Sequence, residues 1–313
     1  MHAVSRLAIA RAENDRDLED MIEVRRAASP ERTPPRIENL RHSMGRALNT
    51  FLIAREGQRP VGCGFVWTDL PVAHAEAHLV VVPDARGRGI GSALLAELGA
   101  LARADGKAEL EGEAREDDKA SRAFLERRGY RVVGGEKWLS LDLEAADERS
   151  PTLPPGISIV TRAERPDLTD ALFAVAQEGV ADIPGSPGPG TYEQFLSIEI
   201  ERPTRRPDLF FIALAGDEAI GYATLDDFGR DAHNGLTAVR RAWRRRGVAR
   251  ALKRTQIAAA KHAGFRRLVT GSEERNVAMR SLNAKLGYRP EPGLNTVVFR
   301  GPADVRSRRG HDG

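Results

Sequence analysis

The chain has 313 residues, enough for two ordinary domains, of which 41% are hydrophobic and 30% charged. Its 48 Lys and Arg nearly balance 45 Asp and Glu, so the net charge of +3 favours neither nucleic acid nor a membrane surface as partner. No apolar run is long enough to span a bilayer, and the N-terminus lacks the apolar region of a signal peptide. The single cysteine, Cys63, excludes an internal disulfide and a cysteine-based zinc site. We therefore expect a cytoplasmic protein with no metal and no membrane partner.

The first half of the chain predicts strands mixed with helices. An apolar strand is followed by a helix with apolar residues at helical spacing, and then by a hairpin around the turn "EG". A further strand leads through an arginine–glycine turn into a long helix, and the half ends with a strand, a helix closed by glycine and a last strand. These elements are expected at 7–13, 16–28, 51–67, 74–82, 89–104, 107–114, up to 130, and 137–143.

The second half predicts the same order of elements, with a hairpin around "GD" and a last helix closed at "KLGY". Three landmarks keep one spacing between the halves: Arg86 lies 158 positions before Arg244, "GY" at 129 lies 158 before "GY" at 287, and Gly62 lies 159 before Gly221. Such a constant spacing indicates a duplicated domain. The corresponding elements are expected at 157–164, 166–179, 209–225, 232–240, 247–263, 265–272, up to 288, and 295–300.

Between the halves, "EAADERSPTLPPG" is charged and then proline-rich, which is typical of a short stiff linker. We therefore predict an α/β protein of two tandem domains, 1–145 and 156–301, each a mixed sheet flanked by helices. The last strands, 137–143 and 295–300, are expected to finish their own halves. Residues 302–313 are expected to form a disordered tail.

Each half carries a turn that is suited to bind an anion. The turns read "ARGRGIGS" over 85–92 and "WRRRGVAR" over 243–250. Glycine lets the backbone approach a ligand closely, and the first amides of a helix point outward at the positive end of the helix dipole. Phosphate or pyrophosphate suits such a site. The spacing is neither that of a Walker loop nor that of the G-x-G-x-x-G dinucleotide motif.

The pattern Arg-x-x-Gly-x-Gly/Ala at 86–91 and 244–249 resembles the signature of the GNAT (GCN5-related) N-acetyltransferases. With the preceding strand and the late "GY", the resemblance covers nearly the whole chain, one domain per half, in a tandem arrangement similar to that of mycothiol synthase. It implies a centrally splayed sheet in each domain and acetyl-CoA as co-substrate, with its pyrophosphate on the turns and its pantetheine arm along the preceding strand. The cofactor-binding residues it implies are Val80, Val81, Val82, Arg86, Gly87, Arg88, Gly89, Ile90, Gly91, Ser92, Ala238, Val239, Arg240, Arg244, Arg245, Arg246, Gly247, Val248, Ala249, Arg250, Asn276 and Asn283.

The second turn departs from the family pattern. Arg245 replaces the glycine that matches Gly87, and Arg241 stands where Pro83 does. A residue other than glycine is acceptable at 245 if its φ is negative.

In the mycothiol-synthase branch of this family, an ionisable residue about eleven positions before the signature serves as general base. That position is His233 in the second half and Ala75 in the first. An imidazole titrates close to neutral pH, whereas an alanine cannot take a proton. Glu76 is one residue away and therefore on the other face, unless a bulge restores it. We expect an active second domain with His233 as base, and a catalytically degenerate first domain with Glu76 as the alternative base.

The family often protonates the departing thiolate with a tyrosine seven residues after an asparagine that opens the last helix. Neither half keeps that tyrosine, because Leu125 and Asn283 stand at its places. Asn276 preserves the polar group that the family uses near the CoA arm. The proton donor is therefore unassigned.

The resemblance implies an amine acceptor, which we expect to be a small molecule bound between the hairpin strands and early loops of the second domain. Asp182, Tyr192, Asp226 and Asp227 are the candidates to hold a cationic amine. The alternatives are a non-catalytic acetyl-CoA sensor or interaction module and a mycothiol-synthase-like acetylation of a cysteinyl amine. A nucleic-acid patch at "RRAWRRR" is disfavoured, because CoA phosphates account for these arginines. A monomer or homodimer is expected.

Overall fold

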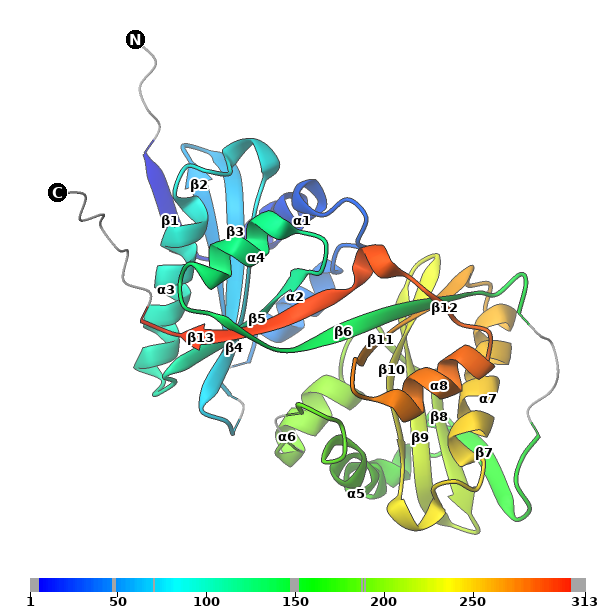
Figure 1. Cartoon of the computed structure of the whole chain (residues 1–313). Helices are drawn as coiled ribbons and strands as arrows, with labels where there is room; N and C mark the ends of the chain where they lie inside the picture. Colours follow the sequence, from blue (N-terminus) through cyan, green and yellow to red (C-terminus); the bar gives the residue numbers. More distant parts are fainter. Residues whose placement is uncertain are drawn as a thin grey trace. The chain divides into compact units, whose positions relative to one another are not determined.

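The computed structural model describes residues 6–46, 49–69, 71–146, 152–186, 188 and 190–304. It divides into two compact units (Figure 1). The first unit is Met1–Gly135 with Thr296–Gly313, and the second is Glu136–Asn295. Most of the expected tail, from 305 on, and positions 147–151 of the expected linker lie outside the described residues.

The first unit contains a mixed sheet in the order β1-β2-β3-β4-β5-β13. Neighbouring strands are antiparallel except β4 and β5, which are parallel. The strands are β1 (Leu7–Arg11), β2 (Asn49–Glu56), β3 (Arg59–Trp67), β4 (His74–Val81), β5 (Glu109–Arg115) and β13 (Thr296–Pro302). The helices are α1 (Asp15–Ala28), α2 (Ile37–Met44), α3 (Ile90–Ala104) and α4 (Lys119–Glu126).

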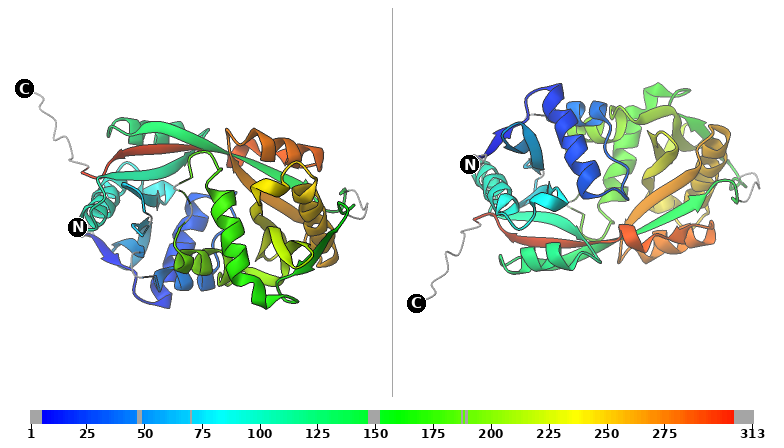
Figure 2. Two further views of the ribbon diagram at one scale, coloured as in Figure 1. Left: turned by 90° about the horizontal axis from the view of Figure 1, so that it is seen from below. Right: turned by 90° about the horizontal axis from the view of Figure 1, so that it is seen from above.

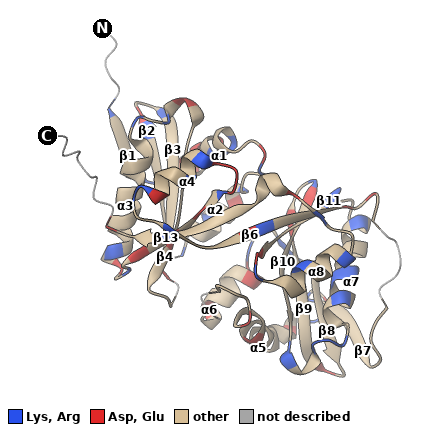
Figure 3. Ribbon diagram, viewed as in Figure 1, with Lys and Arg blue, Asp and Glu red and all other residues tan. Residues whose placement is uncertain are grey.

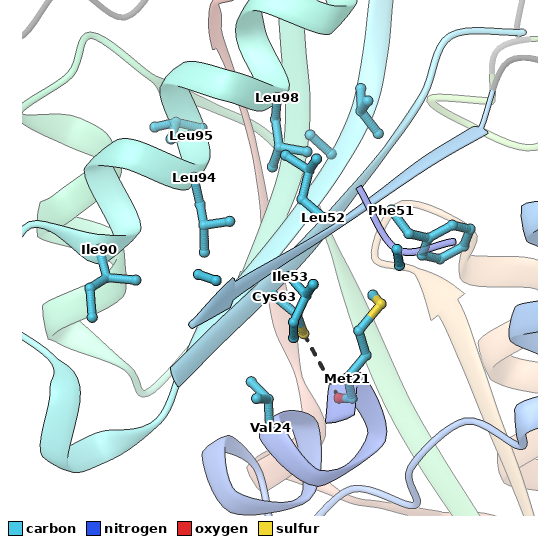
Figure 4. Packing of buried hydrophobic residues seen from close by; sticks show 14 of the residues in the cluster. Met21, Val24, Phe51, Leu52, Ile53, Cys63, Ile90, Leu94, Leu95 and Leu98 are labelled. Atoms are coloured by element: carbon cyan, nitrogen blue, oxygen red, sulfur yellow. Dashed lines mark hydrogen bonds between the residues drawn. The ribbon is translucent and has the colours of Figure 1, made fainter. Parts of the chain in front are cut away.

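Helices α1 and α3 cover opposite faces of this sheet (Figure 4). The Cys63 thiol in β3 donates to the Met21 carbonyl of α1, at 3.8 Å. Gly62, next to it, faces Leu94 of α3, which alternation along a strand requires. The Cys63 thiol is buried, which raises its pKa to about 11, so it stays protonated at neutral pH.

The second unit repeats this plan, in the order β6-β11-β10-β9-β8-β7. Strands β10 and β11 are parallel, and the short strand β12 pairs with β6. Figure 2 gives two further views of both units. The strands are β6 (Arg131–Asp142), β7 (Ile157–Thr161), β8 (Arg205–Ala215), β9 (Glu218–Phe228), β10 (Asp231–Val239), β11 (Arg267–Glu273) and β12 (Arg289–Pro290). The helices are α5 (Thr169–Val180), α6 (Tyr192–Phe195), α7 (Val248–His262) and α8 (Val277–Lys285).

The two faces of the second sheet have separate cores. Leu172 and Val175 of α5 pack with Phe210 and Tyr222 from one face. On the other face, Leu252 of α7 packs in a cluster with alternate residues of β8, β9 and β10. A residue of β10 therefore faces either α5 or α7, and this decides which groups can act together.

The last strands belong to the opposite repeats, contrary to the sequence expectation. From Glu136 to Asp142, β6 pairs antiparallel with β11 of the second unit. Strand β13 pairs along its whole length with β5 of the first unit. The expected division into 1–145 and 156–301 followed chain order, whereas each sheet takes its final strand from the other half. Pairing of either strand beside β5 or β11 satisfies the same backbone groups, so strand propensity does not distinguish the two arrangements.

Among the described residues, no helix is long and apolar enough to cross a membrane. The same part of the chain shows no group of three or more His, Cys, Asp or Glu side chains that would hold a metal ion.

Candidate functional site

The two parallel strands at the centre of each sheet separate after a short paired stretch. In the first unit, β4 and β5 pair from His74–Glu109 to Glu76–Glu111. In the second, β10 and β11 pair from Asp231–Arg267 to His233–Val269. The segments expected to hold a pantetheine arm, 80–82 and 238–240, lie beyond these points. The expected splay is therefore present in both units.

His233 and Glu76 occupy equivalent positions, each being the last residue paired before the strands separate. A bulge in β10 between Asn234 and Thr237 adds one residue that β4 does not contain. Counting eleven positions back from the signature arginine therefore gave the wrong residue in the first unit. Ala75 is equivalent to Ala232, and the bulge aligns Glu76 with His233.

The His233 imidazole is largely enclosed by aromatic rings. Its ring lies 4.4 Å from that of Phe228 and 6.2 Å from that of Trp138. Burial lowers the pKa of His233 below its usual 6.5, assisted by Arg267 and opposed by Asp226 and Asp231. The imidazole is therefore mainly neutral at pH 7, the form that can accept a proton.

Asp226, beside His233 across the β9–β10 ladder, is committed to a buried ion pair. Its carboxylate accepts from Arg205 Nε and Nη2, both at 3.0 Å, and from the Thr204 hydroxyl at 3.2 Å. Arg205 also contacts Glu199 at 2.9 Å. Burial disfavours the Asp226 carboxylate, but Arg205 outweighs it and the pKa of Asp226 is lowered. The network holds Asp226 and the neighbouring part of β9 in place beside His233.

The structure does not bring the four expected acceptor-binding residues together. Asp227 lies on β9 next to Asp226, and its carboxylate accepts from Gly229 N at 2.8 Å. Tyr192 lies in α6 and donates to Asp170 at 2.6 Å. Asp182 follows α5 and binds two arginines of the second turn.

The two glycine turns have the expected backbone form at their helix starts. Gly89 and Gly247 precede α3 and α7 with φ of +83° and +87°. Gly87 has φ +76°, and Arg245, at the corresponding position, has φ +59°. Arg245 therefore does not meet the condition of a negative φ: it is the one non-glycine residue of the described chain in the left-handed region. The first-turn amides of Ile90, Gly91, Ser92, Val248, Ala249 and Arg250 lie at these helix starts.

The signature arginines tether the turn to the rest of each unit. Arg86 Nε donates to the Val81 carbonyl at 3.1 Å, and Arg244 Nε donates to that of Val239 at 2.9 Å. Their Nη2 atoms reach the carbonyls of Ala28 and Glu178, at 3.4 and 3.3 Å. The same role is thus kept in both copies.

Acidic side chains pair with Arg244 in the second turn and with the two arginines that precede the turn. Asp182 binds Arg244 at 2.5 Å and Arg241 at 2.9 Å, while Arg240 binds Glu178 and Glu218. Arg246 lies over the Trp243 ring at 4.9 Å, which removes that ring as a free stacking surface. In the first turn, Arg88 binds Glu56, and Ser92 accepts from Arg128 at 2.7 Å. Figure 3 shows further Lys and Arg residues along α7.

Asn276 and Asn283 have different surroundings. Asn276 caps α8, its Oδ1 accepting from Met279 N at 3.2 Å. Asn283, where the family's tyrosine would stand, is fully buried and neither side-chain atom has a hydrogen-bond partner. Such orphaned amide atoms are costly in a protein interior.

Sequence reasoning missed three further polar residues on the α7 side of the same separation. Lys253 of α7 is 2% exposed, and the hydroxyls of Thr237 in β10 and Ser272 in β11 are buried without partners. With Asn283 they form what we call the polar set. The spacing of 158 would have found them, because the equivalent residues of the first unit are all apolar: Leu95, Leu79, Ala114 and Leu125.

Two family models match the chain. An acetyltransferase (GNAT) domain matches residues 47–132, and the acetyltransferase (GNAT) family matches residues 178–288. No curated protein matches the chain.

Several solved structures share its fold over nearly the full length. A GCN5-related N-acetyltransferase from Sphaerobacter thermophilus is 19% identical, with a TM-score of 0.75 over 95% of this chain and 96% of that one. A tandem GNAT protein from the clavulanic acid biosynthesis pathway is 21% identical, with a TM-score of 0.78 over 96% of this chain and 100% of that one. A putative acetyltransferase from Pyrococcus horikoshii is 15% identical, with a TM-score of 0.63 over 96% and 92%. At these identities the likeness is one of fold.

Proposed function

The chain belongs to the GNAT acetyltransferase family and carries two of its domains in tandem, and on this premise we propose that it transfers acetyl from acetyl-CoA to the amine of a small molecule. The second unit carries out the chemistry. The observation that carries this proposal is the place of His233: a neutral, enclosed imidazole at the point where β10 and β11 separate.

In this proposal, His233 accepts the proton of the attacking amine. An imidazole with a lowered pKa is mainly neutral at neutral pH, so one ring nitrogen is unprotonated and available as a base. Phe228 and Trp138 exclude water from one side of the ring. The Asp226–Arg205 pair beside it is a scaffold that holds the strand, rather than a site for the cationic amine.

Several described residues suit the chemical groups of acetyl-CoA. Helix-start amides after Gly247 and the arginines of the second turn suit its phosphates. Beyond His233 the two strands no longer pair, which leaves backbone groups for the amides of the pantetheine arm. The orphaned side-chain atoms of Asn283, Thr237 and Ser272 lie on the elements that border this opening.

For the first unit we propose acetyl-CoA binding without catalysis, which keeps the sensor alternative for that half. Its turn has glycine at both left-handed positions, Gly87 and Gly89, and Glu76 stands where His233 does. However, the residues of the first unit that are equivalent to the polar set are all apolar. Leu95 and Ala114 are buried in the core, and Leu79 and Leu125 pack against it.

A direct test is thiol release from acetyl-CoA with a panel of small amines that includes a cysteinyl amine, for wild type and Gly247→Trp. The tryptophan would be strained at φ +87° and would occupy the helix start, so turnover should be lost, with one fewer acetyl-CoA site in calorimetry. Gly264→Trp is the matched control: it has φ +80° and open space around it, at the other end of α7. Full turnover by Gly247→Trp would contradict the proposal.

A further inference from the structure

Lys253 is a buried cation for which neither the fold nor the proposed base gives a use. Its side chain is 2% exposed, and no ion pair to a carboxylate is found for it among the described residues. The Lys253 ammonium group lies over the Tyr288 ring, with Nζ 5.3 Å from the ring centroid. Burying an ammonium group without a counter-charge costs several kcal/mol, so its presence requires an explanation.

Tyr288 connects Lys253 to the point where the strands separate. The Tyr288 hydroxyl donates to Asn234 Oδ1 at 2.9 Å, and Tyr288 N donates to the Asn283 carbonyl at 3.1 Å. Asn234 follows His233 directly and points to the opposite face, where its Nδ2 donates to Gln256 of α7 at 3.1 Å. His233 and Lys253 therefore flank the separation from the two faces of the sheet.

Burial alone lowers the pKa of Lys253, to about 7. No carboxylate or guanidinium contributes, including those of β8, β9 and β10, the strands on which α7 packs. Tyr288 is its titratable neighbour, and burial raises the pKa of that phenol, so it stays neutral. Lys253 thus exchanges its proton near neutral pH, unlike an exposed lysine.

We propose that Lys253 is the proton donor to the departing CoA thiolate in the second unit, which rests on the proposed acetyl transfer. The amine nitrogen forms a bond to the thioester carbonyl carbon, and the C–S bond breaks with its electron pair going to sulfur. His233 takes the amine proton, and Lys253 Nζ gives a proton to sulfur. Asn283, in the place of the family's tyrosine, has a free amide to donate a hydrogen bond but no proton to lose.

The charge balance of the site supports this pairing. Before the reaction, Lys253 is the cation and His233 is neutral; afterwards, His233 is the cation and Lys253 is neutral. The enclosed site keeps one positive charge throughout, so no second charge is buried during the reaction. In the first unit Leu95 replaces Lys253 and Leu125 replaces Asn283, so the same exchange is impossible there.

Lys253→Met tests the proposal, because methionine keeps the volume and removes the proton. We expect kcat to fall about 100-fold. We also expect the wild-type pH profile to decline on the alkaline side near pH 7, and Lys253→Met to lose this decline. Lys253→Arg keeps the charge but does not release its proton, so it should not restore the rate. The matched control is Leu95→Met, at the equivalent position of the first unit, with activity unchanged.

A second readout is independent of turnover. The ultraviolet absorbance of the thiolate reports the pKa of CoA bound to the protein. Lys253 beside the sulfur should lower that thiol pKa in wild type, and Lys253→Met should raise it. If Lys253→Met binds CoA with an unchanged thiol pKa, or keeps kcat within about threefold of wild type, the proposal is wrong while the acetyl transfer stands. If wild type turns over no amine, the proposed function fails. The pKa of the bound CoA thiol then still tests whether Lys253 lies beside the sulfur.

Discussion

His233 and Glu76 stand at the same position of two duplicated sheets, although they are not equally spaced from their turns. Each is the last residue of its strand that pairs before the parallel strands separate. The bulge in β10 accounts for the one-residue difference. Both units thus place an ionisable group at this point, but among the described residues only the second unit has a buried lysine on the other face of the sheet.

Arg245 gives a test of backbone strain in the second turn. Its φ of +59° lies in the left-handed region, where a β-carbon costs about 1 kcal/mol and glycine does not. Arg245→Gly should therefore raise the free energy of unfolding by about 1 kcal/mol in thermal or denaturant melts. Its neighbour Arg246 does not have a positive φ, so Arg246→Gly should lower stability instead. Equal effects of the two variants would contradict this reading of the turn.

Asp182 should weaken binding of an anionic ligand at the second turn. Arg241 and then Arg244 lower its pKa to about 2, so it carries a negative charge at every pH of an ordinary assay. Asp182→Asn frees two guanidinium groups, and we expect it to tighten CoA binding about threefold in calorimetry at low salt, with less gain at high salt. Asp167→Asn, which breaks a similar exposed pair with Arg165, serves as control. An unchanged affinity would show that these arginines do not meet the ligand.

The stability of the chain should depend on pH through Lys253. Its pKa is about 7 in the folded protein and near 10.5 once exposed, so between these values the unfolded chain binds more protons. The Lys253 side chain therefore destabilises the fold most below pH 7, and this effect fades as the pH rises toward 10. Lys253→Met should raise the melting temperature more at pH 6 than at pH 9. A pH-independent difference would mean that Lys253 has an ordinary pKa.

Much of the architecture could be predicted from the sequence, because the chain is duplicated and each element expected in one half could be checked against the other half. The constant spacing located both turns, both central strands and the closing "GY" of each half. These are local features, fixed by residues close together in the chain.

The remaining features depend on contacts between distant residues. The exchange of β6 and β13 could not be predicted, because either strand offers the same pairing edge to both sheets. The bulge in β10 moves the register by one residue, which reverses the face of a side chain without changing composition. The sequence prediction placed Asp182 at the acceptor pocket and missed its ion pairs. Its partners, Arg241 and Arg244, are about sixty residues away in the chain, so no local pattern indicates them.

The most direct test of the proposed chemistry is the pH dependence of kcat/KM for acetyl transfer by wild type and His233→Gln. The wild-type profile should decline on the acid side with an apparent pKa below 6.5, because burial lowers the pKa of His233 and its protonated form cannot act as a base. His233→Gln should lose about 100-fold in kcat/KM at pH 7 together with that acid decline, while His262→Gln, an exposed change at the end of α7, should match wild type. A His233→Gln profile of the same height and shape as wild type would contradict the assignment of catalysis to this site.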